Sequence, residues 1–341
     1  VHPDHVIRHN AVMNAPATPA PKAPDERQAS AAEWAAGQLG LERVLLTPGS
    51  GDASFRRYFR FNAGDRSIVL MDAPPDKEDC RPFVEVAERM RHAGLHVPTV
   101  IARDLEQGFL LLEDLGSTDY LSVLTNDTVD SLYADATAAL LRLQANGLVV
   151  GLPPYDRALL LREMQLFPDW LLVRHLALEI DADERAMLDG VFEILIDNAL
   201  TQPLVCVHRD YHSRNLMFLD VDNPGVINFQ DAVAGPVTYD LVSLLRDCYV
   251  RWQGERVDAW VSEYYRAAHA AGLLAGVDEA GFLEWFDLMG VQRHLKAAGI
   301  FARLNHRDGK PGYLGDIPRT LGYVVAVSYT HLTLPTSKPK C

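Results

Sequence analysis

The residues with the clearest chemical potential in this 341-residue chain lie in one short segment, at His208, Arg209 and Asp210, with Asn215 five positions after the aspartate. An apolar run typical of a buried strand leads into this loop, and Asn228 follows a short predicted hairpin. Phosphoryl transfer requires a carboxylate that accepts the hydroxyl proton, oxygen ligands for magnesium and a cradle for the phosphates. Asp210 and the two asparagines supply the first two requirements, so the pattern predicts a phosphotransferase site.

A glycine-rich turn in the N-terminal part offers the phosphate cradle. Gly49 and Gly51 permit the close backbone approach that a phosphate needs, and short polar residues surround them. Two such glycines at a turn are more often a plain hairpin, but this turn precedes the loop of His208 and Asp210 in the chain, which favours a phosphate cradle. We therefore interpret the turn as nucleotide-binding, through Ser50, Gly51, Asp52, Ala53 and Ser54.

The elements that must position these residues fall into two regions. Before Gly116 the pattern predicts five strands, at 41–47, 55–61, 66–75, 97–102 and 108–114, and one helix at 81–94. After Gly116 it predicts mostly helices, at 131–147, 184–200, 237–250, 257–272 and 282–304, with short apolar runs at 204–207, 215–219 and 225–228. The predicted fold class is α+β, with a small antiparallel sheet lobe followed by a larger, mostly helical lobe.

The two ends of the chain show no pattern of a folded core. Residues 1–30 include a stretch rich in proline and alanine and predict a flexible leader. Residues 327–336 resemble one translated frame of a transposase-end sequencing adapter, so we interpret 327–341 as an adapter-derived scar. The predicted domains are an N-lobe at 31–115, which carries the glycine-rich turn and is interpreted as nucleotide-binding, and a catalytic C-lobe at 116–326, which carries Asp210.

Composition excludes several classes of protein. A formal net charge of -14 gives no general attraction to nucleic acids or anionic membranes. The four cysteines form no C-x-x-C pair, which argues against a zinc site or a disulfide framework. The sequence contains neither a signal-peptide pattern nor an apolar run of about 18 residues that could span a bilayer. A cytoplasmic protein that binds neither membrane nor nucleic acid is the expectation.

Seven sequence blocks, in order from Gly51 to Arg319, resemble the aminoglycoside phosphotransferase and choline kinase superfamily, whose members are related to the protein kinases. Their closest similarity is to the branch of bacterial anomeric kinases of N-acetylmuramate and N-acetylglucosamine; the blocks are GDASFRRYFR, IVLMDAPP, DCRPF, GFLLLEDLG, VHRDYHSRNLM, NFQDAVAGPVTYD and MGVQRHLKAAGIFARLNHRDGKPGYLGDIPR. The resemblance implies a two-lobed, protein-kinase-like fold. It also implies that ATP and Mg²⁺ serve as cofactors and that a small amino sugar is phosphorylated on its anomeric hydroxyl, in cell-wall sugar recycling.

The resemblance assigns roles in the catalytic loop. Asp210 would be the base that deprotonates the sugar hydroxyl, and Asn215 would bind magnesium through its side-chain oxygen. His208 and Arg209 are expected to support the loop rather than take part in chemistry. Asp240 is expected to accept hydrogen bonds from the loop backbone.

In the small lobe, the resemblance implies that the backbone at Glu113 and Leu115 holds adenine. The strand lysine that grips phosphates in many kinases is absent, because Met71 stands about where it would lie. Arg57 or its neighbour Arg56 could supply the missing charge, and otherwise both are solvated strand arginines.

Asn228 departs from the pattern of the branch, which has aspartate as the main magnesium ligand at this position. Magnesium prefers anionic oxygen, and an amide carries no net charge. Either Asn228 is an inactivating change or a sequence error, or Asp231 compensates by reaching the metal or the substrate. The possibilities left open are therefore an impaired sugar kinase, a phosphotransferase for an aminoglycoside or another small alcohol, and an inactive nucleotide- or sugar-binding pseudokinase.

The sugar-contacting residues are the least defined part of the site. Aromatic and charged residues in two predicted helices could stack on a sugar or meet the lactyl carboxylate of muramate. Ordinary core aromatics and a solvated basic face explain the same pattern equally well; the candidates are Arg162, Glu163, Phe167, Trp170, Arg293, His294 and Lys296.

Overall fold

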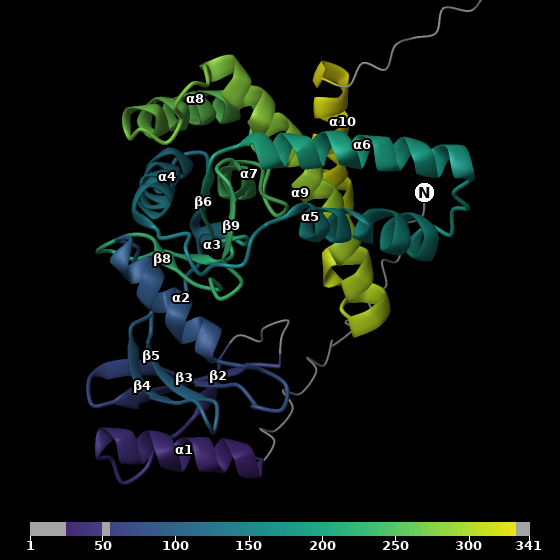
Figure 1. Ribbon diagram of the computed structural model, residues 1–341. Helices are drawn as coiled ribbons and strands as arrows, with labels where there is room; N and C mark the ends of the chain where they lie inside the picture. Colours follow the sequence, from purple (N-terminus) through teal and green to yellow (C-terminus); the bar gives the residue numbers. More distant parts are fainter. Residues whose placement is uncertain (1–24, 50–54, 332–341) are drawn as a thin grey trace, which may run out of the picture.

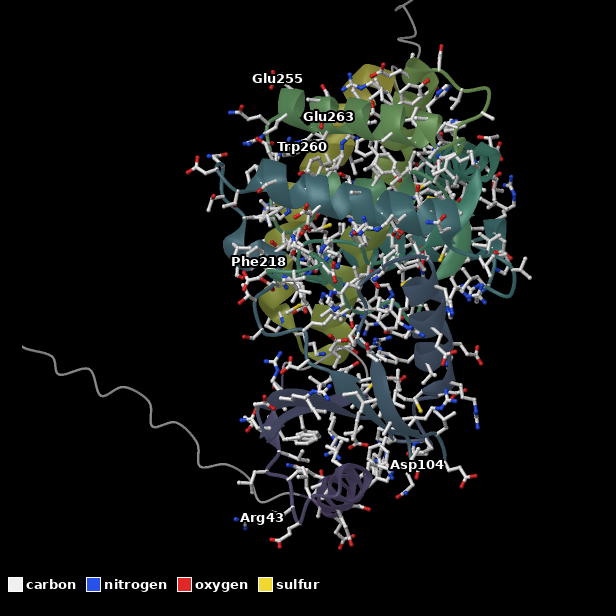
Figure 2. All side chains as sticks on the ribbon, turned by 90° about the vertical axis from the view of Figure 1, so that its left-hand side faces the viewer. Arg43, Asp104, Phe218, Glu255, Trp260 and Glu263 are labelled. Atoms are coloured by element: carbon white, nitrogen blue, oxygen red, sulfur yellow. The ribbon has the colours of Figure 1, made fainter. Side chains whose placement is uncertain are left out.

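The computed structural model describes residues 25–49 and 55–331, which form a sheet region and a larger helical region (Figure 1). In the side view of Figure 2, Asp104 lies at the sheet end of the molecule and Trp260 near the opposite end. None of the helices in the described part of the chain combines the length and apolarity that crossing a membrane requires.

The small lobe is built on one antiparallel sheet with the strand order β1-β2-β3-β5-β4. The five-stranded sheet predicted from the sequence is confirmed, although only Thr47 of the predicted first strand, 41–47, belongs to β1. The strands are β1 (Thr47–Pro48), β2 (Arg57–Ala63), β3 (Arg66–Asp72), β4 (Val100–Asp104) and β5 (Phe109–Glu113).

Helix α1 (Glu26–Leu39) covers one face of this sheet and was not predicted. The Asp25 side chain caps the helix by accepting a 2.7 Å hydrogen bond from the Gln28 amide. Its buried face consists of small residues such as Ala31 and Ala35, packed on apolar side chains of β2, β3 and β5. Residues 26–30, expected to belong to a flexible leader, are therefore helical.

Helix α2 (Arg81–His92) lies on the other face, between the sheet and the helical region. The stripe that predicted this helix, Phe83, Ala87 and Met90, is buried. The Phe83 ring lies 4.8 Å, centroid to centroid, from the Phe229 ring of the large lobe. Helix α2 therefore joins the two lobes through apolar packing.

The large lobe is mostly helical, as predicted. Helices are confirmed in all five predicted stretches, although α7 is shorter than expected and α9 is longer. The helices are α3 (Tyr120–Val123), α4 (Val129–Asn146), α5 (Arg157–Met164), the π-helix η1 (Phe167–His175), α6 (Ala182–Thr201), α7 (Tyr239–Leu245), α8 (Gly254–Ala270), α9 (Glu279–Asp308), the 3₁₀ helix η2 (Pro311–Asp316) and α10 (Ile317–His331).

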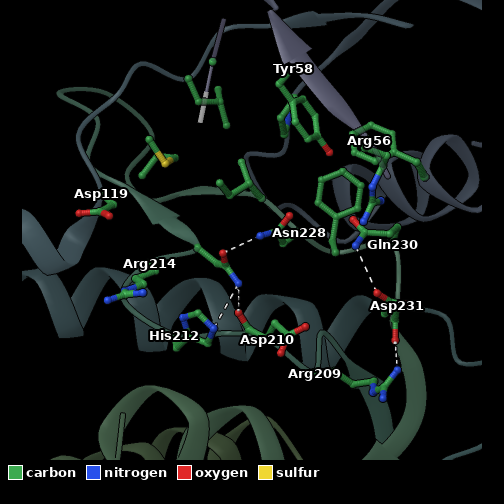
Figure 3. Close-up of a pocket in the computed structure, with 18 of the residues that line it drawn as sticks. Arg56, Tyr58, Asp119, Arg209, Asp210, His212, Arg214, Asn228, Gln230 and Asp231 are labelled. Atoms are coloured by element: carbon green, nitrogen blue, oxygen red, sulfur yellow. Dashed lines mark hydrogen bonds between the residues drawn. The ribbon is translucent and has the colours of Figure 1, made fainter. Parts of the chain in front are cut away.

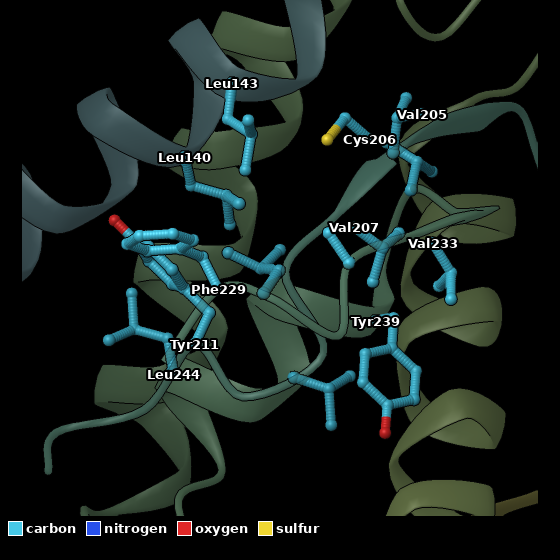
Figure 4. Close-up of a cluster of buried hydrophobic side chains, with 14 of the residues drawn as sticks. Leu140, Leu143, Val205, Cys206, Val207, Tyr211, Phe229, Val233, Tyr239 and Leu244 are labelled. Carbon is cyan, nitrogen blue, oxygen red and sulfur yellow. The ribbon is translucent and has the colours of Figure 1, made fainter. Parts of the chain in front are cut away.

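Two short antiparallel pairs carry the loop that contains Asp210. Strand β6 (Leu204–Val207) pairs with the unpredicted β9 (Val233–Pro236), and β7 (Leu216–Met217) pairs with β8 (Gly225–Val226). Beside strand β6, a buried cluster includes Leu140 from α4, Tyr211 and Phe229 (Figure 4). The loop therefore rests on a packed apolar base that limits its movement.

Several sequence expectations concern the ends of the chain and one loop. The possible phosphate loop, 50–54, lies outside the described residues, as do 1–24 and 332–341. Helix α10 continues into the segment interpreted as adapter-derived, and Val327 within it is buried.

Candidate active site

A cleft of about 850 Å³ lies between the two lobes. Residues lining the cleft include Tyr58 from β2, Glu113 at the end of β5, and Asp210, Asn215 and Asn228 from the loop region of the large lobe. The structure thus brings together most of the described residues that the sequence predicted for catalysis and nucleotide binding (Figure 3).

The backbone of the catalytic loop is held by Asp240 at the start of α7. Its carboxylate accepts hydrogen bonds from the amides of His208 (2.6 Å) and Arg209 (3.0 Å). Arg209 has a φ of 75°, a left-handed conformation that costs roughly 1–2 kcal/mol for a residue with a Cβ. The two hydrogen bonds stabilise this turn. Burial raises the pKa of Asp240 to about 7, an effect that the two amide donors only partly offset.

The His208 ring supports the loop through two hydrogen bonds. Its Nδ1 accepts the Asp210 amide hydrogen at 3.2 Å, and its Nε2 lies 3.0 Å from the Ile227 carbonyl oxygen, to which it donates. Burial lowers the pKa of His208 to about 4, so the ring is neutral at pH 7 with its proton on Nε2. The loop is thereby tied to the hairpin that leads to Asn228.

The Asp210 carboxylate lines the cleft, and within the described ranges no group donates a hydrogen bond to it. Burial tends to raise its pKa, but the positive charge of Lys296, followed by the nearby His212, outweighs burial and keeps the pKa below the usual range. The carboxylate is therefore ionised at neutral pH. An ionised carboxylate with open acceptor sites is suited to accept a hydroxyl proton from a bound alcohol.

Asn215 forms hydrogen bonds with both Asp210 and Asn228, two residues labelled in Figure 3. The Asn215 Nδ2 donates to the Asp210 carbonyl at 2.9 Å, which orients its Oδ1 away from that carbonyl. The Asn228 Nδ2 donates to this Oδ1 at 2.7 Å. Asn228 has a φ of 62°, a conformation that asparagine and aspartate tolerate better than most residues.

This arrangement does not fit a magnesium ion as it stands. The predicted ligand oxygen of Asn215 already accepts an N–H, and the donor comes from the residue predicted as the second ligand. Within the described residues no cluster of three or more His, Cys, Asp or Glu side chains is placed to hold a metal. Both predicted ligands are also neutral, whereas Mg²⁺ prefers carboxylate oxygen.

In Figure 3, Asp231 lies beside Gln230 and Arg209, away from Asn228. Its carboxylate accepts a 3.2 Å hydrogen bond from Gln230, and its carbonyl accepts one of 3.3 Å from Arg209. Asp231 lines the cleft, but its described hydrogen bonds do not join it to the Asn215–Asn228 pair.

The connection between the lobes lies at the predicted adenine-binding segment. The Glu113 amide donates to the Thr99 carbonyl at 2.9 Å, and the Glu113 carboxylate accepts from the Thr99 hydroxyl at 2.8 Å. Burial tends to raise the pKa of Glu113, but hydrogen bonds from Thr99 lower it overall. Because the Glu113 amide is engaged, adenine contacts here would use other backbone groups, such as the Glu113 carbonyl and the Leu115 amide.

The structure places Arg57 away from the cleft, on the α1 side of the sheet, contrary to the sequence expectation. Its guanidinium pairs with the buried Asp72 at 2.5 Å and also with Asp25. Successive residues of a strand face opposite sides, so its neighbour Arg56 lines the cleft instead. Met71, at the predicted lysine position, is fully buried.

A cluster of buried charged residues supports the large-lobe side of the site. The sequence analysis named Glu163, Arg209 and Lys296 separately but did not predict that they are in contact. Glu163 accepts from Arg209 and from the Tyr155 hydroxyl, and its Oε1 lies 3.0 Å from Lys296 Nζ. Lys296 also donates to the Tyr239 hydroxyl at 2.9 Å. Burial tends to raise the pKa of Glu163, but Lys296 and then Arg209 outweigh it, so the carboxylate is ionised.

Of the sugar candidates, only Arg293 and Lys296 line the cleft. The His294 ring is buried between the carbonyls of Gly290 and Arg246, and Trp170 lies under the Arg174 guanidinium. The sequence analysis missed other large-lobe side chains that line the cleft, although helical spacing from Lys296 could have indicated some of them; they include Arg214, Tyr249, Ile300, Phe301, Arg303, Arg307 and Tyr313.

Comparison with known proteins identifies the family. Residues 46–279 match the model of the phosphotransferase enzyme family. A relative from Pseudomonas aeruginosa named N-acetylmuramate/N-acetylglucosamine kinase is 53% identical over 279 residues, covering 82% of each chain. A relative of the same name from Neisseria meningitidis serogroup B is 43% identical, over 85% of this chain and 87% of the relative.

Solved structures with a similar fold are more distant in sequence. Choline kinase LicA from Streptococcus pneumoniae has a TM-score of 0.60 at 11% identity, over 86% of this chain and 98% of that chain. A thermostable mutant of an aminoglycoside phosphotransferase has a TM-score of 0.58 at 15% identity, over 89% of this chain and all of that chain. The kinase-like, two-lobed fold is thereby confirmed. By the family match and the two relatives, the chain belongs to the phosphotransferase enzyme family.

Proposed function

We propose that this enzyme transfers the γ-phosphate of ATP to the anomeric hydroxyl of N-acetylmuramate or N-acetylglucosamine. The observation that carries the proposal is the ionised Asp210 carboxylate, open toward the cleft in a chain 53% identical to a kinase named for these sugars. Relatives at 53% and 43% identity favour this substrate class over the aminoglycosides, because the aminoglycoside phosphotransferase cited above shares only 15% identity. An enzyme that uses ATP and serves sugar recycling is expected to work in the cytoplasm.

Asp210 would accept the proton of the sugar hydroxyl as that oxygen attacks phosphorus. The loop geometry favours this role because Asp240 and His208 fix the backbone on either side of Asp210, through the Arg209 amide and the Asp210 amide. Lys296 keeps the carboxylate ionised. Precise placement of the acceptor hydroxyl is the main contribution that a protein makes to phosphoryl transfer.

ATP would bind at the small-lobe side of the same cleft. The Glu113 carbonyl and the Leu115 amide are proposed to hold adenine, and the turn at 50–54 is proposed to cover the phosphates. Arg56 lines the cleft from the position next to Arg57 and is better placed than Arg57 to face the phosphates.

Magnesium would require the Asn228 amide to turn, so that its Oδ1 replaces its Nδ2 beside Asn215. Two neutral amide oxygens would then be the ligands from the chain. This pair binds a divalent cation more weakly than an amide and a carboxylate do, because it contributes no negative charge.

The hydrogen bond between the two asparagines supports a second candidate function, binding of nucleotide and sugar without efficient turnover. In that case the Asn228–Asn215 contact fills the place where the metal would act. The two candidate functions, an active kinase and a binding protein with little turnover, share the same nucleotide and sugar ligands and differ only in the rate of phosphate transfer.

The test is release of ADP from Mg·ATP in the presence of N-acetylmuramate, N-acetylglucosamine, an aminoglycoside or choline. The chain as it stands is assayed beside its Asn228→Asp variant. Turnover of either amino sugar supports the kinase, and activity restricted to the variant supports the impaired form. Turnover of the aminoglycoside or choline, with neither amino sugar used, would overturn the proposed substrate class.

A further inference from the structure

Helix α9 presents a basic face to the cleft. Arg293, Lys296, Arg303 and Arg307 all line it, at spacings of three, seven and four residues that place them on one side of a helix. The chain as a whole carries a net charge of -14. The large-lobe wall of the cleft is therefore locally positive in a protein whose net charge is negative. Such a local positive face indicates an anionic ligand.

Three of these four cations have partners within the protein. Lys296 lies 3.0 Å from the Glu163 carboxylate, and Arg307 pairs with Asp308 at 2.7 Å. Arg293 is buried and contacts the Cys248 sulfur at 3.4 Å.

Arg303 differs from the other three. Its side chain is half-buried, and within the described residues its buried Nε has no hydrogen-bond partner. Burial and then the neighbouring Arg307 lower its pKa, and the charges of Asp308 and Glu163 offset this only in part. Arginine offers five N–H donors in a planar fork that matches a carboxylate. A bound carboxylate would supply the missing acceptor.

Arg303 is also placed where an acceptor sugar would extend. Lys296, whose charge acts on Asp210, precedes Arg303 by seven residues, or about 10.5 Å along a helix. Both residues line the same cleft. Glu163, the partner of Lys296, also acts on the charge of Arg303, which places Arg303 on the same side of the site.

Aromatic rings border this part of the cleft. Phe301 and Tyr313 are stacked with their centroids 5.7 Å apart, and the Arg214 guanidinium lies 3.8 Å from the centre of the Tyr249 ring. Such faces suit the apolar side of a pyranose ring. A sugar whose anomeric hydroxyl meets Asp210 would thus have aromatic surface and Arg303 on the large-lobe side.

We infer that Arg303 binds the lactyl carboxylate of N-acetylmuramate and so sets the preference between the two amino sugars. The inference rests on the proposed function. N-acetylglucosamine lacks the lactyl group, so it has no partner for Arg303, and the two substrates serve as an internal comparison.

The test uses the full chain and measures binding of each sugar by titration calorimetry in the presence of Mg·ADP. Arg303→Met removes the charge at similar length, and we expect the Kd for N-acetylmuramate to rise at least about tenfold, as for loss of a charge-assisted hydrogen bond. The Kd for N-acetylglucosamine should change by less than about threefold. Arg303→Lys, which keeps the charge but loses the planar fork, should give an intermediate value for N-acetylmuramate.

Arg307→Met is the matched control, one turn further along the same face and already paired with Asp308. It should leave the ratio of the two Kd values nearly unchanged. Three results would overturn the inference and leave the proposed function intact. Arg303→Met could change the Kd of both sugars equally, or leave the Kd of N-acetylmuramate unchanged. Arg307→Met could raise the Kd of N-acetylmuramate as much as Arg303→Met does. Failure of the unmodified chain to bind either sugar would overturn both.

Discussion

Replacing Asn228 by aspartate should affect the protein in opposite directions with and without magnesium nucleotide. In the unliganded protein the Asn228 Nδ2 donates to the Asn215 Oδ1 at 2.7 Å. Aspartate has no hydrogen to donate, so two acceptor oxygens would face each other at this distance. The free energy of unfolding should fall by roughly 1–3 kcal/mol, the range for a lost hydrogen bond with an unpaired acceptor. The melting temperature should fall by about 2–4 °C for each kcal/mol.

With Mg·ADP the same change should stabilise the complex. A new negative charge beside a cation is worth on the order of 4 kcal/mol per unit charge at 4 Å and an effective dielectric constant of about 20. Desolvation of the carboxylate reduces this gain, so we expect the affinity for Mg·ADP to rise at least tenfold, or about 1.4 kcal/mol. Calorimetric titration of Mg·ADP and of ADP with EDTA separates the metal from the nucleotide. The gain should be present only in the titration with magnesium.

Asn228→Gly provides the matched control, because glycine accepts the φ of 62° without strain and removes the amide without adding charge. It should lower the stability of the free protein and bring no gain with magnesium. If Asn228→Asp leaves the melting temperature of the free protein unchanged, the hydrogen bond does not have the stabilising role derived above. If its affinity for Mg·ADP matches that of Asn228→Gly, the metal does not bind at this pair.

Three further changes test the catalytic loop. Asp210→Asn, combined with Asn228→Asp in one chain, should lower kcat by about 10²–10⁴ relative to Asn228→Asp alone, while the nucleotide Kd stays within threefold. Full turnover of the double variant would refute the role of Asp210 as the base. His208 has its pKa lowered to about 4 from 6.5, so its contribution to stability is complete above pH 6.5 and is lost as the pH falls toward 4. That loss is about 3 kcal/mol, and His208→Gln should remove this part of the acid sensitivity measured in urea unfolding at several pH values. Asp240→Asn should lower the free energy of unfolding by about 1–3 kcal/mol, because an amide group would replace one oxygen that accepts a loop N–H; an unchanged urea midpoint would contradict this.

The proximity of Asp210, Asn215 and Asn228 could be predicted because it depends on local order. A strand, a short loop and a hairpin bring the three residues together within twenty positions of the chain. The structure favours Arg56 over Arg57 as the arginine of the cleft, because neighbouring residues of an extended segment face opposite sides and a sequence does not show which side faces the cleft. The buried Asp72, which binds the Arg57 guanidinium, becomes its neighbour only through pairing with the next strand.

Other features were hidden for different physical reasons. Helix α1 packs through alanines, which give a weak apolar stripe in the sequence. Strand β9 contains a glycine and a proline, both poor strand residues, and depends on pairing with β6. Arg303 lines the cleft, and its Nε has no partner among the described residues. Both features depend on how α9 packs in the large lobe, which no local sequence pattern reveals.

The packing of Phe83 on Phe229 has a consequence for the way the molecule unfolds. Through this contact, one apolar cluster runs from the α2 face of the sheet across to the floor of the catalytic loop. Separating the lobes would expose this shared surface to water on both sides, at a cost that grows with its area. The two lobes should therefore melt in a single cooperative transition, with equal calorimetric and van't Hoff enthalpies. A fragment that stops at residue 115 would expose to water the Phe83 ring of α2, which packs on Phe229 in the whole chain.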